Sequence, residues 1–193
     1  MSDAEYELRF MKAGIEQLES YLLSRDVFRP IGIPNKASEP PYPQLTLGWL
    51  LLFQLRARAV SQTSKQQSEL KRLEAEMEVV RSKWRTAWSN KAAAEFRSRL
   101  NLWTNFLNDF ETDPTDNLDR FPYEVTRRVQ LDLLMEEIFE LPKADRDALN
   151  GLDVLLNAIF IPGDFVWEPI FKPSFPKARF WYLYGSLRVD QGA

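Results

Sequence analysis

LKRLEAEMEVVRSKWRTA, residues 70–87, places apolar side chains at alternating intervals of three and four residues. These apolar positions are Leu70, Leu73, Met77, Val80, Trp84 and Ala87. The interval is that of the a and d positions of a coiled coil. Glutamate, lysine and arginine fill most of the positions between them, which is typical of a helix whose other faces meet water. The stretch therefore predicts a coiled-coil-like helix.

The helical pattern extends well beyond this stretch on both sides. From Gln44 to Asp113 the chain contains no proline and a single glycine, Gly48. The apolar track slips near Ser89–Asn90, which leaves two alternatives for residues 44–112: one continuous, bent helix, or a helix pair that turns back near 89–90. We favour the continuous form. Its length would be on the order of 100 Å at 1.5 Å per residue, too long for this chain to cover alone.

The rest of the sequence divides into further helices and one linker. Helices are expected over residues 3–24, 123–140 and 144–159, which gives an all-α chain of about five helices. Residues 29–43 contain five prolines and predict a rigid linker within a helical domain that spans 1–161. On the first helix, the apolar seam is Leu8, Met11, Ile15, Leu18 and Leu22.

The last part of the chain, residues 162–193, has a different composition. Prolines alternate there with aromatic residues, a pattern that excludes a long helix and predicts an extended arm. Large aromatic side chains bury a large area, so we expect them to anchor the arm on the helical body or, as the alternative, on a partner. The expected anchors are Phe165, Trp167, Phe171, Phe175, Phe180 and Trp181.

The composition excludes several kinds of chemistry. The 193 residues contain no histidine and no cysteine, which removes histidine-assisted triads, thiolate nucleophiles, disulfides and the usual zinc ligands. The phosphate-binding glycine motifs are also absent. We therefore expect no enzyme activity, no cofactor and no metal, and a solvated face for Glu136, Glu137 and Glu140. An alternative is a magnesium-dependent carboxylate enzyme built on Asp109, Asp113, Asp116 and Asp119.

The sequence predicts no membrane segment. Its most hydrophobic run, residues 45–55, is about half the length of a bilayer-spanning helix of about 20 residues. The acidic N-terminus lacks the basic and apolar regions of a signal peptide, so a cytoplasmic location is expected.

Charge is segregated along the chain. Residues 56–99 hold 11 Lys/Arg against 5 Asp/Glu, a net of +6, whereas residues 108–140 hold 3 against 10, a net of −7. Either the two segments lie side by side, or the first offers a basic face to a polyanion such as nucleic acid. The residues of such a face would be Arg81, Lys83, Arg85, Lys91, Arg97 and Arg99.

These observations favour a non-catalytic scaffold or assembly protein. It would act as a homo-oligomer or as a subunit of a larger complex, because a long helical rod leaves apolar surface that only a partner can cover. We expect the partner-binding residues on the heptad track. They are Leu70, Leu73, Met77, Val80, Trp84 and Trp88. The nucleic-acid-associated protein and the magnesium enzyme remain the alternatives.

Overall fold

Three separate helices replace the long rod expected over residues 44–112. The computed structural model describes residues 4–34 and 36–189, and its longest helix has 28 residues. Its helices are α1 (Ala4–Leu23), α2 (Leu47–Val60), α3 (Ser64–Lys83), α4 (Arg85–Thr112), α5 (Pro114–Asn117), α6 (Phe121–Met135) and α7 (Lys143–Ile159). The only other regular elements in the described residues are short 3₁₀ turns (η1, Leu118–Arg120; η2, Pro169–Ser174; η3, Trp181–Leu183) and strands β1 (Phe160–Phe165) and β2 (Tyr184–Leu187). The mostly helical class is confirmed, and the very long helix is not present.

The first break in the rod lies between α2 and α3. Ser61 leaves the helical region with φ −76° and ψ 91°. Thr63 then caps α3: its side chain accepts a hydrogen bond from the Gln66 N–H at 3.2 Å, and the Gln66 side chain accepts one from the Thr63 N–H at 3.1 Å. This reciprocal capping box satisfies backbone donors that a new helix start would leave unpaired. The chain can therefore reverse direction here without glycine or proline.

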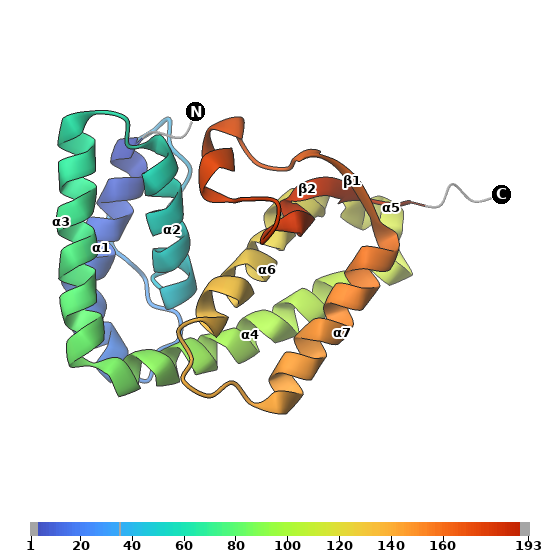
Figure 1. The fold of residues 1–193 in the computed structure, drawn as a ribbon, viewed down its shortest axis with the longest axis horizontal. Helices are drawn as coiled ribbons and strands as arrows, with labels where there is room; N and C mark the ends of the chain where they lie inside the picture. Colours follow the sequence, from blue (N-terminus) through green and yellow to red (C-terminus); the bar gives the residue numbers. More distant parts are fainter. Residues whose placement is uncertain (1–3, 35, 190–193) are drawn as a thin grey trace.

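The second break lies at Trp84, between α3 and α4. Its φ of −117° and ψ of 36° fall outside the helical region, and the chain turns sharply there (Figure 1). The backbone hydrogen bonds nevertheless continue, from the Trp84 N–H to the Val80 carbonyl at 2.9 Å and from the Trp88 N–H to the Trp84 carbonyl at 2.8 Å. The favoured continuous helix is therefore wrong, and the alternative break near 89–90 lies about one and a half turns beyond the observed corner at Trp84.

Helices α1, α2 and α3 form a bundle at one side of the molecule (Figure 1). Helix α3 contacts α1 more extensively than any other element. The apolar seam expected on the first helix is buried, and so are Leu70, Leu73 and Met77 on α3. Both seams are thus buried within the chain's own fold, α3 mainly against α1 and α1 against both α2 and α3.

The second half of the molecule is organised around α4, which packs mainly against α6 and also contacts α7 (Figure 1). Strand β1 follows α7 directly and pairs antiparallel with β2, with Phe160 opposite Leu187. The described part of the C-terminal segment lies on the chain's own helices: η2 contacts α2, and Trp167 Nε1 donates to the Pro122 carbonyl at 2.9 Å. Of the expected anchors, the buried ones are Phe171, Phe175 and Phe180, and the half-buried ones are Phe165, Trp167 and Trp181.

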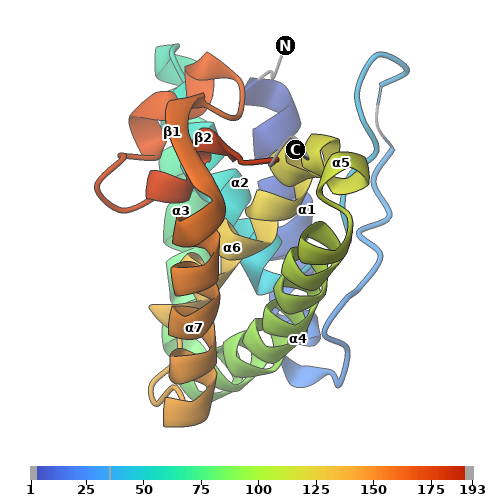
Figure 2. The same cartoon turned by 90° about the vertical axis from the view of Figure 1, so that its right-hand side faces the viewer.

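The proline-rich segment between α1 and α2 runs along the outside of the molecule (Figure 2). Two backbone hydrogen bonds close it at its base: the Arg29 N–H donates to the Leu45 carbonyl at 3.1 Å, and the Leu45 N–H donates to the Arg29 carbonyl at 2.7 Å. Tyr42 stacks on Tyr6 of α1, with ring centroids 4.4 Å apart. The linker is therefore an ordered loop fixed to α1. Among the described helices, none has the combination of length and apolar character that a bilayer crossing requires.

Candidate partner-binding groove

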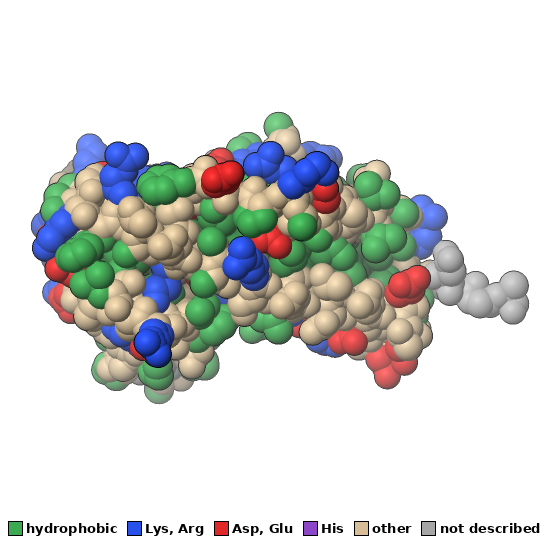
Figure 3. All heavy atoms as spheres, turned by 90° about the horizontal axis from the view of Figure 1, so that it is seen from below, with side chains coloured by type: hydrophobic (Ala, Val, Ile, Leu, Met, Phe, Trp, Pro, Cys, Tyr) green, Lys and Arg blue, Asp and Glu red, His purple; other side chains and the backbone are tan. Residues whose placement is uncertain are grey.

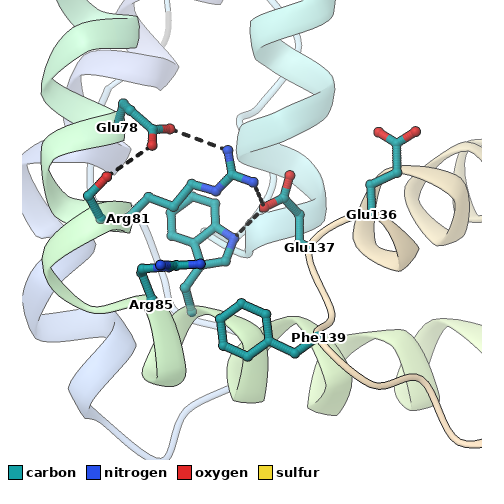
Figure 4. Close-up of a pocket in the computed structure, with 8 residues that line it drawn as sticks. Glu78, Arg81, Arg85, Glu136, Glu137 and Phe139 are labelled. Atoms are coloured by element: carbon teal, nitrogen blue, oxygen red, sulfur yellow. Dashed lines mark hydrogen bonds and ion pairs between the residues drawn. The ribbon is translucent and has the colours of Figure 1, made fainter.

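A groove of about 560 Å³ lies where the end of α3, the start of α4 and the segment after α6 meet (Figure 4). The corner at Trp84 brings the last turn of α3 and the first turn of α4 to the same side. Helix α6 ends at Met135 instead of the expected residue 140, so the following residues are free to form the opposite wall. The lining residues are Glu78, Arg81, Ser82, Arg85, Trp88, Glu136, Glu137 and Phe139.

A largely covered carboxylate, that of Glu137, occupies the centre of the groove. Its side chain is 10% exposed and lies 2.7 Å from Arg81 Nη2, and it accepts a hydrogen bond of 2.8 Å from Trp88 Nε1 (Figure 4). Desolvation raises the pKa of Glu137, while the charge of Arg81 and the Trp88 hydrogen bond oppose that rise. The expected solvated face is thus wrong for this residue, which instead links α3 and α4 to the end of α6.

An exposed aromatic ring and an arginine form the outer edge of the groove. Phe139 is 65% exposed, although its backbone N–H is fixed by a 2.9 Å hydrogen bond to Ser89 Oγ on α4. The Arg85 guanidinium lies 5.6 Å from the centre of the Phe139 ring (Figure 4). Among the described residues, Arg85 forms no ion pair. The edge therefore presents an apolar ring and an uncompensated positive charge.

A second hollow of about 390 Å³ continues on the other side of the Arg81–Glu137 pair. Apolar residues of α2, α3 and α6, namely Leu55, Met77 and Leu133, line it together with charged side chains, and Arg179 from the C-terminal segment is one of these. The Arg179 guanidinium pairs with Glu136 at 3.0 Å. The two hollows adjoin along the Arg81–Glu137 pair, since they share Glu78, Arg81, Trp88, Glu136 and Glu137.

The residues predicted to bind a partner do not form an exposed seam. Leu70, Leu73, Met77 and Trp88 are at most 6% exposed, and Val80 and Trp84 are half-buried. The physical reason is that α1 supplies, within the same chain, the apolar face that a partner was expected to supply. Of these residues, Trp88 lines both the groove and the adjoining hollow, and Met77 lines the adjoining hollow.

The predicted polyanion-binding residues do not share one face either. Several of the cations already have carboxylate partners. These pairs are Arg81 with Glu137, Lys83 with Glu19, Arg97 with Asp145 and Arg99 with Glu95. Lys91 is buried and its Nζ donates to the carbonyls of Ser24 and Asp26 after α1. In Figure 3 basic side chains are interspersed with acidic and apolar ones rather than gathered into a patch.

The remaining sequence-based alternative also gains no support from geometry. Within residues 4–34 and 36–189, no group of three or more acidic side chains is arranged to hold a metal ion. Asp113 instead caps α5, with its side chain accepting from the Asp116 N–H at 3.2 Å.

Comparison of the chain with protein-family models, with curated proteins and with solved structures finds no match. Function is therefore inferred from the groove itself.

Proposed function

We propose that this chain is a non-catalytic assembly protein that binds another protein segment in the Arg85–Phe139 groove. The observation that carries the proposal is the outer edge of the groove, where an exposed phenylalanine lies beside an arginine without an ion-pair partner in the described residues. Aromatic residues and arginine are enriched at the energetically dominant positions of protein interfaces. The groove replaces the heptad track as the proposed binding surface.

The chemistry of the edge specifies the partner. Arg85 is suited to a carboxylate, because its planar guanidinium can donate two parallel hydrogen bonds to one acidic group. Phe139 is suited to an apolar or aromatic side chain next to that acid. The three glutamates that line the groove each have an arginine partner, which reduces their repulsion of an acidic segment: Arg81 pairs with Glu78 and Glu137, and Arg179 pairs with Glu136. We therefore propose an acidic, aromatic-containing protein segment as the occupant.

The test compares two double variants of the full chain. Arg85→Glu with Phe139→Ser reverses the charge and removes the ring at the groove, while Arg146→Glu with Val154→Ser reverses a charge and replaces an exposed apolar side chain on the surface of α7. Sedimentation velocity from 5 to about 100 µM measures self-association of each. Cross-linking in the cells that produce the chain, followed by measured affinities for each purified partner, tests heteromeric binding.

The proposal predicts that a partner, whether a second copy or another protein, binds the unmodified chain and the α7 variant equally. The groove variant should bind it at least ten-fold more weakly, the loss expected for two interface residues of this kind. If every partner binds the groove variant and the unmodified chain with the same affinity, the groove is not the interface. If the chain is monomeric and binds no protein, it is not an assembly protein.

A further inference from the structure

Two adjoining cavities between α2 and α6 form a second concave region. We call the cavity lined by Arg99 and Gln130 the inner cavity, with a volume of about 240 Å³, and the one lined by Trp167 and Phe171 the outer cavity, with about 350 Å³. Both cavities are also lined by Trp49, Tyr123 and Thr126. Together they fall within the usual size of small-molecule sites, roughly 300–1,000 Å³. Four residues of α6 contribute to the inner wall at the spacing of one helix face. They are Tyr123, Thr126, Arg127 and Gln130.

Gln130 supplies the observation that points to a ligand. Its side chain is 0% exposed, and neither its amide nitrogen nor its amide oxygen has a hydrogen-bond partner in the described residues. Most buried polar atoms in native proteins are hydrogen-bonded, because an unpaired buried amide is strongly unfavourable. Gln130 is also one of the residues that line the inner cavity, so a polar ligand group bound there would be close enough to pair with this amide after a small shift of the side chain.

Two arginines give the inner cavity a positive character. Arg99 is 6% exposed and pairs with Glu95 at 3.1 Å, but its Nη1 has no acceptor among the described residues. Arg127 forms an ion pair with Glu124. Burial lowers the pKa of Arg127; Tyr123 opposes that fall, while the positive charges of Arg99 and Arg120 add to it. An anion in the cavity would stabilise both guanidinium groups.

Aromatic side chains line both cavities. In the inner cavity, Phe28 lies beneath the Arg99 guanidinium, with 5.2 Å between the guanidinium carbon and the ring centre. Trp49 and Tyr123 line the boundary between the cavities, and Trp167 and Phe171 line the outer one. Such walls favour a planar, apolar ring over an aliphatic or purely ionic ligand.

We infer that these cavities bind a small planar aromatic molecule that carries a carboxylate or a phosphate group. The anionic group lies between Arg127 and Arg99, the Gln130 amide hydrogen-bonds to the ligand, and the ring lies against Trp49 and Tyr123. This site is independent of the proposed protein-binding groove, because the two share no lining residue.

The experiment measures binding to the full chain by isothermal titration calorimetry and by the shift in Tm. The probes are adenosine monophosphate and indole-3-carboxylate, which present the same chemistry with phosphate and with carboxylate, and inorganic phosphate, which lacks the ring. Saturable binding of either aromatic anion, with at least ten-fold weaker binding of inorganic phosphate, is the expected result. Equal binding of inorganic phosphate, or no binding of either aromatic anion at millimolar concentration, would overturn the inference.

Three variants locate the site. Arg127→Gln should weaken binding of the aromatic anion at least ten-fold, whereas Arg97→Gln, a matched change at an exposed arginine outside the cavities, should leave it unchanged. Gln130→Met should also weaken binding, but it should raise the Tm of the free protein by about 2–4 °C or more because it removes the unpaired amide. Unchanged affinity in both Arg127→Gln and Gln130→Met would refute the site.

Discussion

Replacement of Leu73 by alanine tests whether the heptad seam is satisfied within one chain. Leu73 is 0% exposed and lies on α3, whose main contact is α1. Truncation of a fully buried leucine costs about 3 kcal/mol, through lost transfer free energy and the cavity that remains. For a chain of this length, we expect the Tm to fall by about 6–12 °C.

The assay is thermal and urea unfolding of the unmodified chain, of Leu73→Ala and of Val79→Ala at 2 and 100 µM. Val79 is on the same helix but 68% exposed, so its truncation should change the free energy of unfolding by less than about 0.5 kcal/mol. An intramolecular seam predicts the same loss for Leu73→Ala at both concentrations. If the unmodified chain is more stable at 100 µM and Leu73→Ala abolishes that difference, the seam joins separate chains and our reasoning is refuted.

Three further changes address buried polar and close contacts. Arg128→Met should cost about 3–5 kcal/mol in urea unfolding, because Arg128 lies 2.6 Å from Asp132 and 2.7 Å from Asp153 and its loss leaves the buried Asp132 without a cation, held by the Tyr182 hydroxyl alone. The pKa of Glu137 in the folded protein is raised above its usual 4.5. The free energy of unfolding contributed by this shift is therefore complete below about pH 4.5 and is lost as the pH rises through the folded pKa. Glu137→Gln should remove this pH dependence from a profile of stability against pH. Gly48→Ala would place a Cβ 2.7 Å from a buried carboxylate oxygen, so calorimetry should show a loss of about 1–3 kcal/mol.

The heptad pattern predicted helices and buried faces well, but it could not identify the surface that covers them. Leu70, Leu73 and Met77 are as buried as a coiled-coil seam requires. Helix α1 carries a seam with the same spacing and lies in the same chain. The connection between the two helices gives this contact a much higher effective concentration than contact with a separate molecule has. The sequence did contain the signal for the reversal, since Thr63 and Gln66 form the T-x-x-Q pattern of a capping box.

The groove was less predictable than the helices. Its cationic members belong to the predicted basic set, but Glu137 and Phe139 come from a segment expected to be helical or solvated. Their positions depend on where α6 ends and on the direction of α4 after Trp84, which are tertiary effects. No glycine, proline or capping residue in the sequence marks Trp84 as a corner. In the structure the backbone hydrogen bonds on both sides of Trp84 resemble those of an uninterrupted helix.

The closed loop between α1 and α2 has a consequence for proteolysis. Two contacts hold the sides of the loop together and do not depend on the peptide bonds between them. They are the backbone pairing of Arg29 with Leu45 and the ion pair of Arg9 with Glu39. A single cut after Lys36 would therefore leave two fragments that stay associated, since α1 remains embedded among its neighbours. The same topology makes the molecule a natural candidate for reassembly from two separately produced pieces.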